Sequence, residues 1–307
     1  MTSEHWNPEN LPTQEGKTFV VTGGNAGIGY FISEQLAGAG ARIVLASRSE
    51  QKAETAAASI RRHAPGAAVE FVRLDLTSLT SIREAADAIR RHGPIDGLIN
   101  NAGITTGGRE RKVTKDGLEL VVGSNAFGPF ALTALTLPAL APNGRIISQT
   151  SQATQVVKLD PANLQSEHGK FNFFRAYGYS KHAVLAFAFE LQRRLTAADS
   201  RVESLLAHPG IAIDLKSPRR PGIIDRGRPS DYLTALYAQG KERGAWPAVR
   251  AATDPNTKGG EYYGPRRRVA GRAVRVEATA ASASEEFGQE FWRQAEKATG
   301  ITFDFRA

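Results

Sequence analysis

Residues 18–30 read TFVVTGGNAGIGY, and this stretch decides the fold of the chain. Its first five residues predict a buried strand, and the residues from Gly27 onward predict a helix. The glycines between them allow a tight turn and a close backbone approach to a pyrophosphate, which the free N–H groups of the helix N-terminus also favour. A purely structural turn is the alternative. We predict a dinucleotide-binding turn made by Gly23, Asn25, Ala26, Gly27 and Ile28.

Apolar runs alternate with amphipathic segments along most of the chain. Strands are predicted over residues 18–22, 41–47, 69–74, 95–100, 145–150 and 202–207, and helices over 27–39, 50–62, 78–91, 116–140 and 177–197. Because the apolar runs are continuous and each is followed by a helix, they favour a parallel sheet covered on both faces. We predict an α/β fold with a doubly wound parallel sheet of the Rossmann type.

The pattern breaks after residue 210. Residues 210–229 predict a loop, 230–240 a short helix, 259–275 a Gly- and Arg-rich loop, and 284–299 a final helix capped by Ser282 or Ser284. We expect these segments to pack on the same sheet as a lid and a tail. The predicted organisation is therefore a single domain over 1–307, with a core over 16–210 and the substrate loop, lid and tail over 211–307.

The composition excludes several classes of chemistry. The 307 residues are 41% hydrophobic and 23% charged, which is ordinary for a globular protein. With no cysteine, the chain has no disulfide, thiolate metal site or cysteine nucleophile, and we predict no metal site. The N-terminus lacks the pattern of a signal peptide, and apolar stretches such as 130–141 are too short to span a bilayer. We expect a cytoplasmic protein without a membrane span.

Basic residues outnumber acidic ones by 39 to 31, which gives a formal charge of +8. We interpret this excess as a solvated basic surface that attracts an anionic cofactor, and not as a nucleic-acid site. The arginine clusters at 218–220 and 266–268 lie in loop-like sequence without interleaved aromatic residues.

The choice of cofactor is indicated by Ser47 and Arg48, which end the second predicted strand. In a doubly wound fold this tip faces the adenosine ribose, where a carboxylate would select NAD and repel the 2′-phosphate of NADP. A hydroxyl and a guanidinium stand there instead, and a guanidinium can bind phosphate through two charge-assisted hydrogen bonds. We therefore predict a preference for NADP(H) over NAD(H), with a solvent-pointing Arg48 as the alternative.

Four motifs now carry a resemblance to the short-chain dehydrogenase/reductase family. They are TGGNAGIG (22–29), NNAG (100–103), a serine near the end of the fifth strand (Ser151), and Tyr177-Gly-Tyr-Ser-Lys181. SNAFGPFALT (124–133), AHPG (207–210) and GGEYYGP (259–265) resemble the bacterial members of the retinol-dehydrogenase-like branch.

The resemblance implies further cofactor contacts. Asp75 and Leu76 would lie near the adenine, and Asn101, Ala102 and Gly103 would lie under the cofactor. Asn and Gly also favour a strand-terminating turn, and we expect both interpretations of this motif to hold. Further implied contacts are Pro209 and Gly210, together with Tyr177 and Lys181.

The catalytic hypothesis rests on the spacing of Tyr177 and Lys181, which are four residues apart on one helix face. The lysine ammonium would favour the phenolate of Tyr177, the general acid/base, and the resemblance implies that it also reaches the nicotinamide ribose. Ser151 would orient the substrate oxygen, and Asn125 would hold a water that links Lys181 to solvent. Tyr179 competes with Tyr177, but it has Ala183 at the four-residue offset. Ser148 and Thr150 compete with Ser151.

One departure from the family pattern matters. HPGIAIDL (208–215) carries Asp214 where the family usually has a threonine that helps bind the nicotinamide carboxamide. An ionised aspartate cannot donate a hydrogen bond. Either the loop shifts, or backbone groups take over, or nicotinamide binding is weaker.

The substrate pocket is expected above the carboxyl ends of the strands, between residues 152–174 and 210–229. The candidate apolar lining is Phe171, Phe173, Phe174, Ile211 and Ile213, which could equally be core residues under long loops. We predict an NADP(H)-preferring oxidoreductase that interconverts a lipophilic alcohol and its carbonyl. The alternatives are a non-catalytic NADP(H)-binding sensor and an epimerase or dehydratase on the same fold; assembly into a homodimer is left open.

Overall fold

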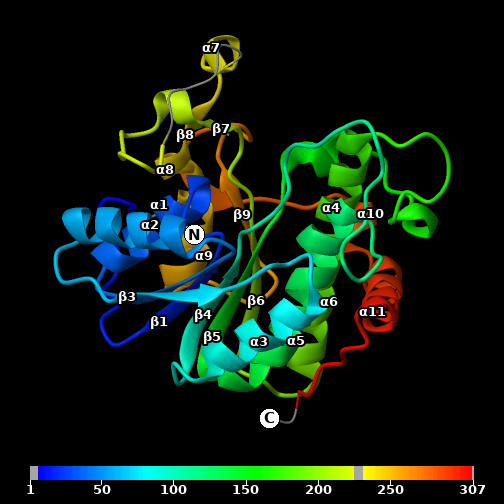
Figure 1. Ribbon diagram of the computed structural model, residues 1–307, viewed down its shortest axis with the longest axis horizontal. Coiled ribbons are helices and arrows are strands. Elements are labelled where there is room, and N and C mark those ends of the chain that lie inside the picture. Colours follow the sequence, from blue (N-terminus) through cyan, green and yellow to red (C-terminus); the bar gives the residue numbers. More distant parts are fainter. Residues whose placement is uncertain (1–5, 225–230, 306–307) are drawn as a thin grey trace.

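A sheet of eight strands forms the middle of the protein, with helices against both faces (Figure 1). The computed structural model describes residues 6–224 and 231–305. The strand order is β10-β9-β6-β5-β4-β1-β2-β3, and neighbours are parallel except β9 and β10. The strands are β1 Thr18–Thr22, β2 Arg42–Ser47, β3 Val69–Arg73, β4 Ile95–Asn100, β5 Leu140–Gln149, β6 Glu203–Ala207, β9 Tyr262–Pro265 and β10 Ala273–Arg275. The predicted doubly wound, Rossmann-type sheet is confirmed.

Two layers of helices enclose the sheet (Figure 1). One face is covered by α1 Gly27–Gly38, α2 Glu50–His63 and α9 Trp246–Thr253. The other is covered by α3 Leu79–Arg90, α5 Gly128–Thr136 and α6 Phe173–Ala197, with the C-terminal helix α11 Glu285–Thr299 packed on α6. The core therefore lies on both sides of the sheet, as continuous apolar strands require.

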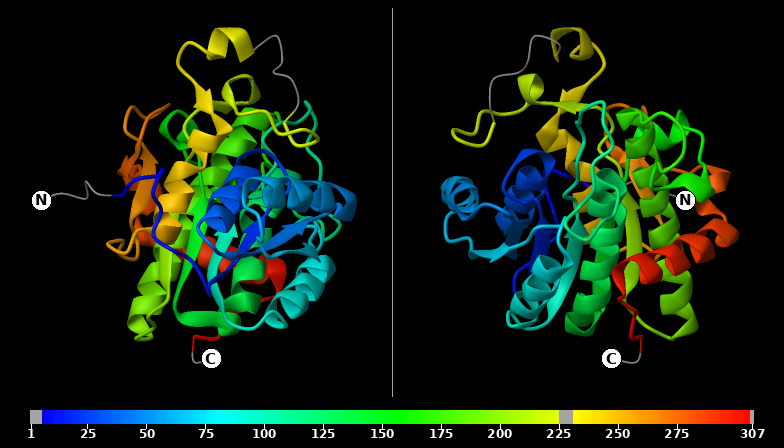
Figure 2. Two further views of the ribbon diagram at one scale, coloured as in Figure 1. Left: turned by 90° about the vertical axis from the view of Figure 1, so that its left-hand side faces the viewer. Right: turned by 45° about the vertical axis from the view of Figure 1, so that its right-hand side comes forward.

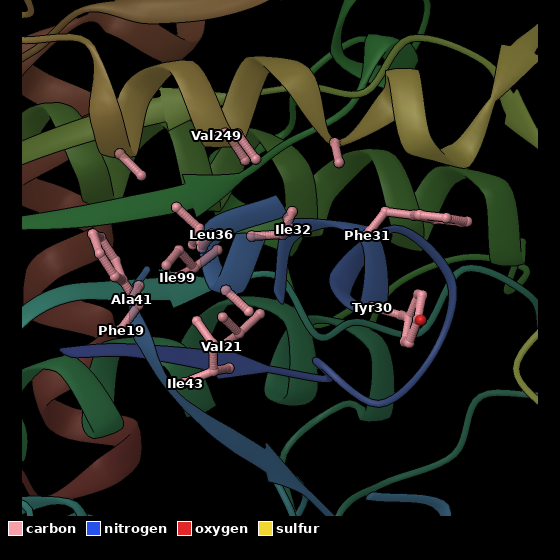
Figure 3. Packing of buried hydrophobic residues seen from close by; sticks show 14 of the residues in the cluster. Phe19, Val21, Tyr30, Phe31, Ile32, Leu36, Ala41, Ile43, Ile99 and Val249 are labelled. Atoms are coloured by element: carbon pink, nitrogen blue, oxygen red, sulfur yellow. The ribbon is translucent and has the colours of Figure 1, made fainter. Parts of the chain in front are cut away.

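Strand β1 shows how the alternation of side chains divides the core. Phe19 and Val21 point to the face of α1 and α9, where they meet residues such as Leu36 and Val249 (Figure 3). Val20, between them, belongs to the cluster on the opposite face. Because successive side chains of a strand point to opposite faces, a strand buried on both faces is apolar at every position.

The prediction of a loop over 259–275 is wrong, because this segment contributes β9 and β10 to the sheet. Tyr262 and Tyr263 are buried, and they pair with Leu206 and Ala207 of β6. The flanking glycines and arginines obscured two short strands that are stabilised by pairing with a distant strand and not by a local pattern.

Three boundaries also differ from the predictions. The helix expected from residue 116 begins at α4 Leu120–Val122 and passes through a π-helical turn, Gly123–Phe127, into α5. Strand β5 begins at Leu140, five residues early. Helix α6 begins at Phe173, because the side chain of Asn172 accepts a hydrogen bond from the backbone N–H of Arg175 and caps the helix.

The lid stands above the carboxyl ends of the strands (Figures 1 and 2). It contains a small parallel ladder between β7 Ala212–Ile213 and β8 Gln239–Gly240, followed by α8 Lys241–Gly244. The predicted helix over 230–240 is present only as α7 Asp231–Thr234. The end of the predicted loop, residues 225–229, lies outside the described residues.

One stretch in the described part of the chain, Leu120–Ala139, is long and apolar enough to cross a membrane by length and composition. Its most apolar window is 89% buried inside the protein, between the sheet and its neighbouring helices. This burial is typical of a core helix.

Candidate active site

The sequence-predicted site residues gather where the carboxyl ends of β1, β4, β5 and β6 meet. Thr22 joins two of these ends: its hydroxyl accepts hydrogen bonds from the backbone N–H groups of Asn101 and Ala102, at 2.9 and 3.0 Å. The Asn101 amide donates in turn to the carbonyl oxygen of Thr22, at 2.9 Å. Strand order reverses between β1 and β4, and ligands of doubly wound sheets bind at such a switch point.

The glycine-rich turn has the backbone geometry that the sequence predicts. Gly23 and Gly27 adopt φ values of 65° and 58°, which side chains disfavour. A Cβ at Gly29 would lie 2.4 Å from the Asn101 amide nitrogen, so the first turn of α1 closes tightly onto Asn101. No side chain caps the helix at Ala26, and its first turn holds no acidic residue. Backbone N–H groups are thus free for an anion.

At the tip of β2, Ser47 and Arg48 lie on the adenosine side of this turn. The Ser47 hydroxyl is buried and has no hydrogen-bond partner in the protein, whereas the Arg48 side chain is exposed. A buried hydroxyl without a partner is rare and fits a ligand contact. The carboxylate of the nearby Asp75 accepts two hydrogen bonds from Thr77, one from its backbone N–H at 3.0 Å and one from its hydroxyl at 2.7 Å. Burial alone would raise the pKa of Asp75, but these bonds and the charges of Lys115 and Arg48 hold it below its ordinary value.

Tyr177 and Lys181 share one face of α6, in its second and third turns. The Lys181 ammonium lies 5.7 Å from the centre of the Tyr177 ring. Ser151, two residues after the end of β5, lies close enough to Tyr177 for its hydroxyl to lower the tyrosine pKa, so the structure brings these three predicted residues together. Leu76, Gly103 and Pro209 line the same edge of the sheet at the ends of β3, β4 and β6.

Burial controls the ionisation of both groups. It raises the pKa of Tyr177 above its ordinary value, and the nearby Ser151 hydroxyl offsets this rise only in part. The expectation that the lysine ammonium favours the phenolate is not met, because burial, which favours the neutral phenol, is the largest influence on this pKa. Burial also lowers the pKa of Lys181 to about 8, and its ammonium donates to the backbone carbonyl oxygen of Gln149 at 2.9 Å.

Asn125 lies in the π-helical turn Gly123–Phe127, a kind of irregularity that recurs at functional sites. Its side chain accepts a hydrogen bond from the backbone N–H of Ile104 at 2.7 Å and donates to the carbonyl oxygen of Ile104 and the hydroxyl of Ser180. Asn125 thus joins the loop after β4 to the helix that carries Lys181. Its link to Lys181 through a water stays a prediction.

The competing residues lie elsewhere. Tyr179 is packed in the core cluster behind α6 and borders a separate surface cavity. The Ser148 hydroxyl is buried inside β5, and the Thr150 hydroxyl donates a hydrogen bond to the backbone carbonyl oxygen of Lys181. Ser151 is the serine in contact with Tyr177.

Gly210 and Asp214 begin the segment after β6. Gly210 has a φ of 66°, and a Cβ there would lie 2.3 Å from the carbonyl oxygen of Val269. Asp214 is not an isolated anion at this edge: its carboxylate lies 2.5 Å from the ammonium of Lys241 on α8. Sequence reasoning missed Lys241, because no local pattern marks a partner that is 27 residues away.

The residues predicted to form the apolar walls of the substrate pocket lie in three different places. Phe173 stacks on Tyr177, with ring centres 6.4 Å apart, and therefore lies at the site. Phe174 does not: it is 55% exposed and lines the surface cavity of about 610 Å³ that Tyr179 borders. The half-buried residues Ile211 and Ile213 belong to the lid.

Gln152 and His208 were not predicted as site residues, although Gln152 follows Ser151 and His208 lies in the AHPG motif. The Gln152 amide nitrogen lies 3.0 Å from Nε2 of His208, and the backbone N–H of Gly210 donates to Nδ1. Burial lowers the pKa of His208 to about 4, so this imidazole is neutral. Within the described ranges, no three His, Asp or Glu side chains are grouped to hold a metal.

These features define a nicotinamide-dependent oxidoreductase site on a Rossmann-type sheet. The family model for short chain dehydrogenases matches residues 17–213, and the chain belongs to this family. It is an enzyme that interconverts an alcohol and a carbonyl with NAD(P).

Several known proteins and solved structures are similar to this chain. The mouse (Mus musculus) polyprenol dehydrogenase is 34% identical over 95% of this chain and 87% of its own length. Human (Homo sapiens) retinol dehydrogenase 13 is 42% identical over 65% of this chain and 60% of its own. An uncharacterized protein from Mycobacterium Paratuberculosis has a structure with a TM-score of 0.81 and 32% identity over 97% of this chain and 99% of that one. A Burkholderia cenocepacia short chain dehydrogenase in complex with NADP shares the fold, with a TM-score of 0.65 and 22% identity over 84% of this chain and 98% of that one.

Proposed function

We propose that this protein is an NADP(H)-preferring oxidoreductase that interconverts a lipophilic, isoprenoid-like alcohol and its carbonyl compound, with Tyr177 as general acid/base. The observation that carries the proposal is the buried ammonium of Lys181, 5.7 Å from the centre of the Tyr177 ring, with the Ser151 hydroxyl beside the same phenol. A purely binding protein has no need of a positioned proton donor.

The residues present fit a dinucleotide with a 2′-phosphate. Gly23, Gly27 and the uncapped N-terminus of α1 would hold the pyrophosphate. The unpartnered hydroxyl of Ser47 and the guanidinium of Arg48 would hold the 2′-phosphate. A guanidinium can donate two parallel, charge-assisted hydrogen bonds to the oxygens of one phosphate. The bound cofactor supplies the hydride.

The protein groups supply the proton. Because burial raises the pKa of Tyr177, its phenol is protonated at neutral pH and is ready to donate to the oxygen of a carbonyl substrate. Ser151 would hydrogen-bond that oxygen and hold it against the phenol. Lys181 would stabilise the phenolate that remains and bind the ribose hydroxyls. In alcohol oxidation the same groups act in reverse.

The substrate class follows from the wall at Tyr177 and from the relatives. Phe173 presents a ring parallel to Tyr177, and apolar walls retain apolar chains by excluding water from them. Two of the relatives are named for polyprenol and retinol, which are both isoprenoid alcohols.

The test is a panel of isoprenoid, aliphatic and sugar carbonyl compounds assayed with NADPH and NADH. We expect turnover with isoprenoid aldehydes and NADPH. Absence of hydride transfer across the panel, in protein that binds NADPH, would instead support the sensor alternative. An isomeric product without net oxidation or reduction would point to an epimerase.

A further inference from the structure

Asp214 and Lys241 are brought together by the small ladder of the lid. β7 and β8 are parallel, and their last register pair joins Ile213 to Gly240. Asp214 directly follows β7 and Lys241 directly follows β8, and their side chains form an ion pair with 2.5 Å between carboxylate oxygen and ammonium nitrogen. Adjacent parallel strands place residues of one register side by side, so the ladder itself sets this pairing.

The lid also holds Lys241 against the glycine-rich turn. The backbone carbonyl oxygen of Glu242 accepts a hydrogen bond of 2.8 Å from Gln35, which ties α8 to α1 (Figure 1). The backbone N–H of Lys241 donates to the Ser217 hydroxyl at 2.8 Å. A Cβ built on Gly27 would lie 3.9 Å from the ammonium of Lys241. The ammonium of this ion pair thus stands at the uncapped helix N-terminus.

We propose that Lys241 is a pyrophosphate-binding residue of the cofactor site and that Asp214 neutralises its charge when the cofactor is absent. The proposal rests on the proposed function, because it adds a ligand to the same dinucleotide site. The glycine-rich turn contributes the partial positive charge of a helix N-terminus, and Lys241 contributes an ammonium from the lid. Both lie beside Gly27, although the two segments are far apart in the sequence. A pyrophosphate there would meet backbone N–H groups from below and an ammonium from the lid.

The pairing also accounts for the departure at position 214. An unpaired carboxylate beside the cofactor would repel its phosphates. With Lys241 bound to it, the pair presents no net charge, and the ammonium retains hydrogen atoms for a second acceptor. Asp214 is therefore a positioning residue whose negative charge is harmful only when Lys241 is removed.

The test compares Lys241→Gln with a matched control, Arg243→Gln, on the same short helix. Arg243 has a side chain that is 60% exposed and lies over Trp246, so its loss changes the net charge equally without touching the turn. The dissociation constants of NADPH, of 2′-phospho-ADP-ribose and of adenosine 2′-monophosphate are measured by calorimetry. The second probe has a pyrophosphate but no nicotinamide, and the third has no pyrophosphate.

We expect Lys241→Gln to weaken NADPH and 2′-phospho-ADP-ribose by about tenfold, near the lower limit for a charge-assisted bond because the ammonium is partly exposed. Adenosine 2′-monophosphate should bind unchanged, Arg243→Gln should match the wild type, and Lys241→Arg should retain most of the affinity. Equal binding of 2′-phospho-ADP-ribose by Lys241→Gln and Arg243→Gln overturns the role of Lys241. A wild type that binds no dinucleotide overturns the proposed function as well, so the two failures are distinguishable.

A second pair of variants tests Asp214. Alone, Asp214→Asn should change NADPH affinity by no more than about threefold. Added to Lys241→Gln, it should restore part of the lost affinity, because the uncompensated carboxylate is removed. A double variant no better than Lys241→Gln overturns the neutralising role of Asp214.

Discussion

The ammonium of Lys181 donates a hydrogen bond to the backbone carbonyl oxygen of Gln149, 2.9 Å away, in a fully buried position. One carbonyl compensates only part of the hydration that the ammonium loses, so burial lowers the lysine pKa to about 8. The buried ammonium therefore reduces the stability of the folded protein, at the position where the proposed reaction needs a positive charge next to Tyr177. Functional sites commonly hold groups that reduce stability in this way.

Replacement of Lys181 by Met should therefore stabilise the protein without cofactor. A lysine pKa of about 8 in place of 10.5 corresponds to a penalty on the order of 3 kcal/mol, and we expect a gain of ~1–3 kcal/mol at pH 7. Between pH 8 and 10.5 the unfolded wild type binds more protons than the folded one, so its stability rises with pH and the advantage of Met shrinks. Denaturant unfolding at several pH values measures this, with the exposed Lys158→Met as control. A pH-independent difference would contradict the assignment.

Tyr177→Phe should reduce turnover by ~10²–10⁴-fold, which is the usual contribution of a positioned acid or base. The substitution retains the ring that stacks on Phe173, so folding and NADPH binding should be preserved. Tyr179→Phe is the matched control, because that ring lies in the core behind α6. Steady-state reduction of an aldehyde with NADPH gives the comparison. Near-normal reduction by Tyr177→Phe would show that another group donates the proton.

Arg48→Asp should reverse the cofactor preference. The wild type should bind NADPH at least about tenfold more tightly than NADH, because a charge-assisted hydrogen bond contributes ~1.5–3 kcal/mol. Arg42→Gln, at the opposite end of β2 and paired with Glu70, serves as control and should keep the wild-type preference. Titration with both cofactors measures the ratio. Equal affinities in the wild type would refute the role of Arg48.

Trp292→Ala should reduce the free energy of unfolding by ~3–5 kcal/mol. Trp292 on α11 is 1% exposed and packs against Phe130 and under the guanidinium of Arg194. We expect one cooperative transition at lower denaturant, because we propose that 1–307 is a single domain in which the tail completes the core. Phe174→Ala, at a 55% exposed side chain, is the control. A second transition, with the core over 16–210 unaffected, would show that the tail folds separately.

Much of the fold was predictable because its signals are local. The apolar runs at 18–22 and 95–100 match β1 and β4 residue for residue, since a strand buried on both faces is marked at every position. Strands β9 and β10 escaped prediction, because each is short and gains its stability from a distant partner. The start of α6 was placed four residues late, because the phenylalanines around its Asn172 cap were assigned to a loop that lines the substrate pocket.

In the candidate site, too, features with local sequence signals were predictable and features that depend on long-range packing were not. By itself the sequence determined the parallel α/β sheet, the phosphate-binding turn at Gly23 and Gly27, and the one-face spacing of Tyr177 and Lys181, because helix and strand periods convert spacing into direction. Only the tertiary structure decided that burial favours the neutral phenol of Tyr177, that Phe174 lines a separate surface cavity, and that Asp214 is paired. Desolvation and ion pairing depend on what the rest of the chain packs around a group, and no stretch of neighbouring residues contains that information.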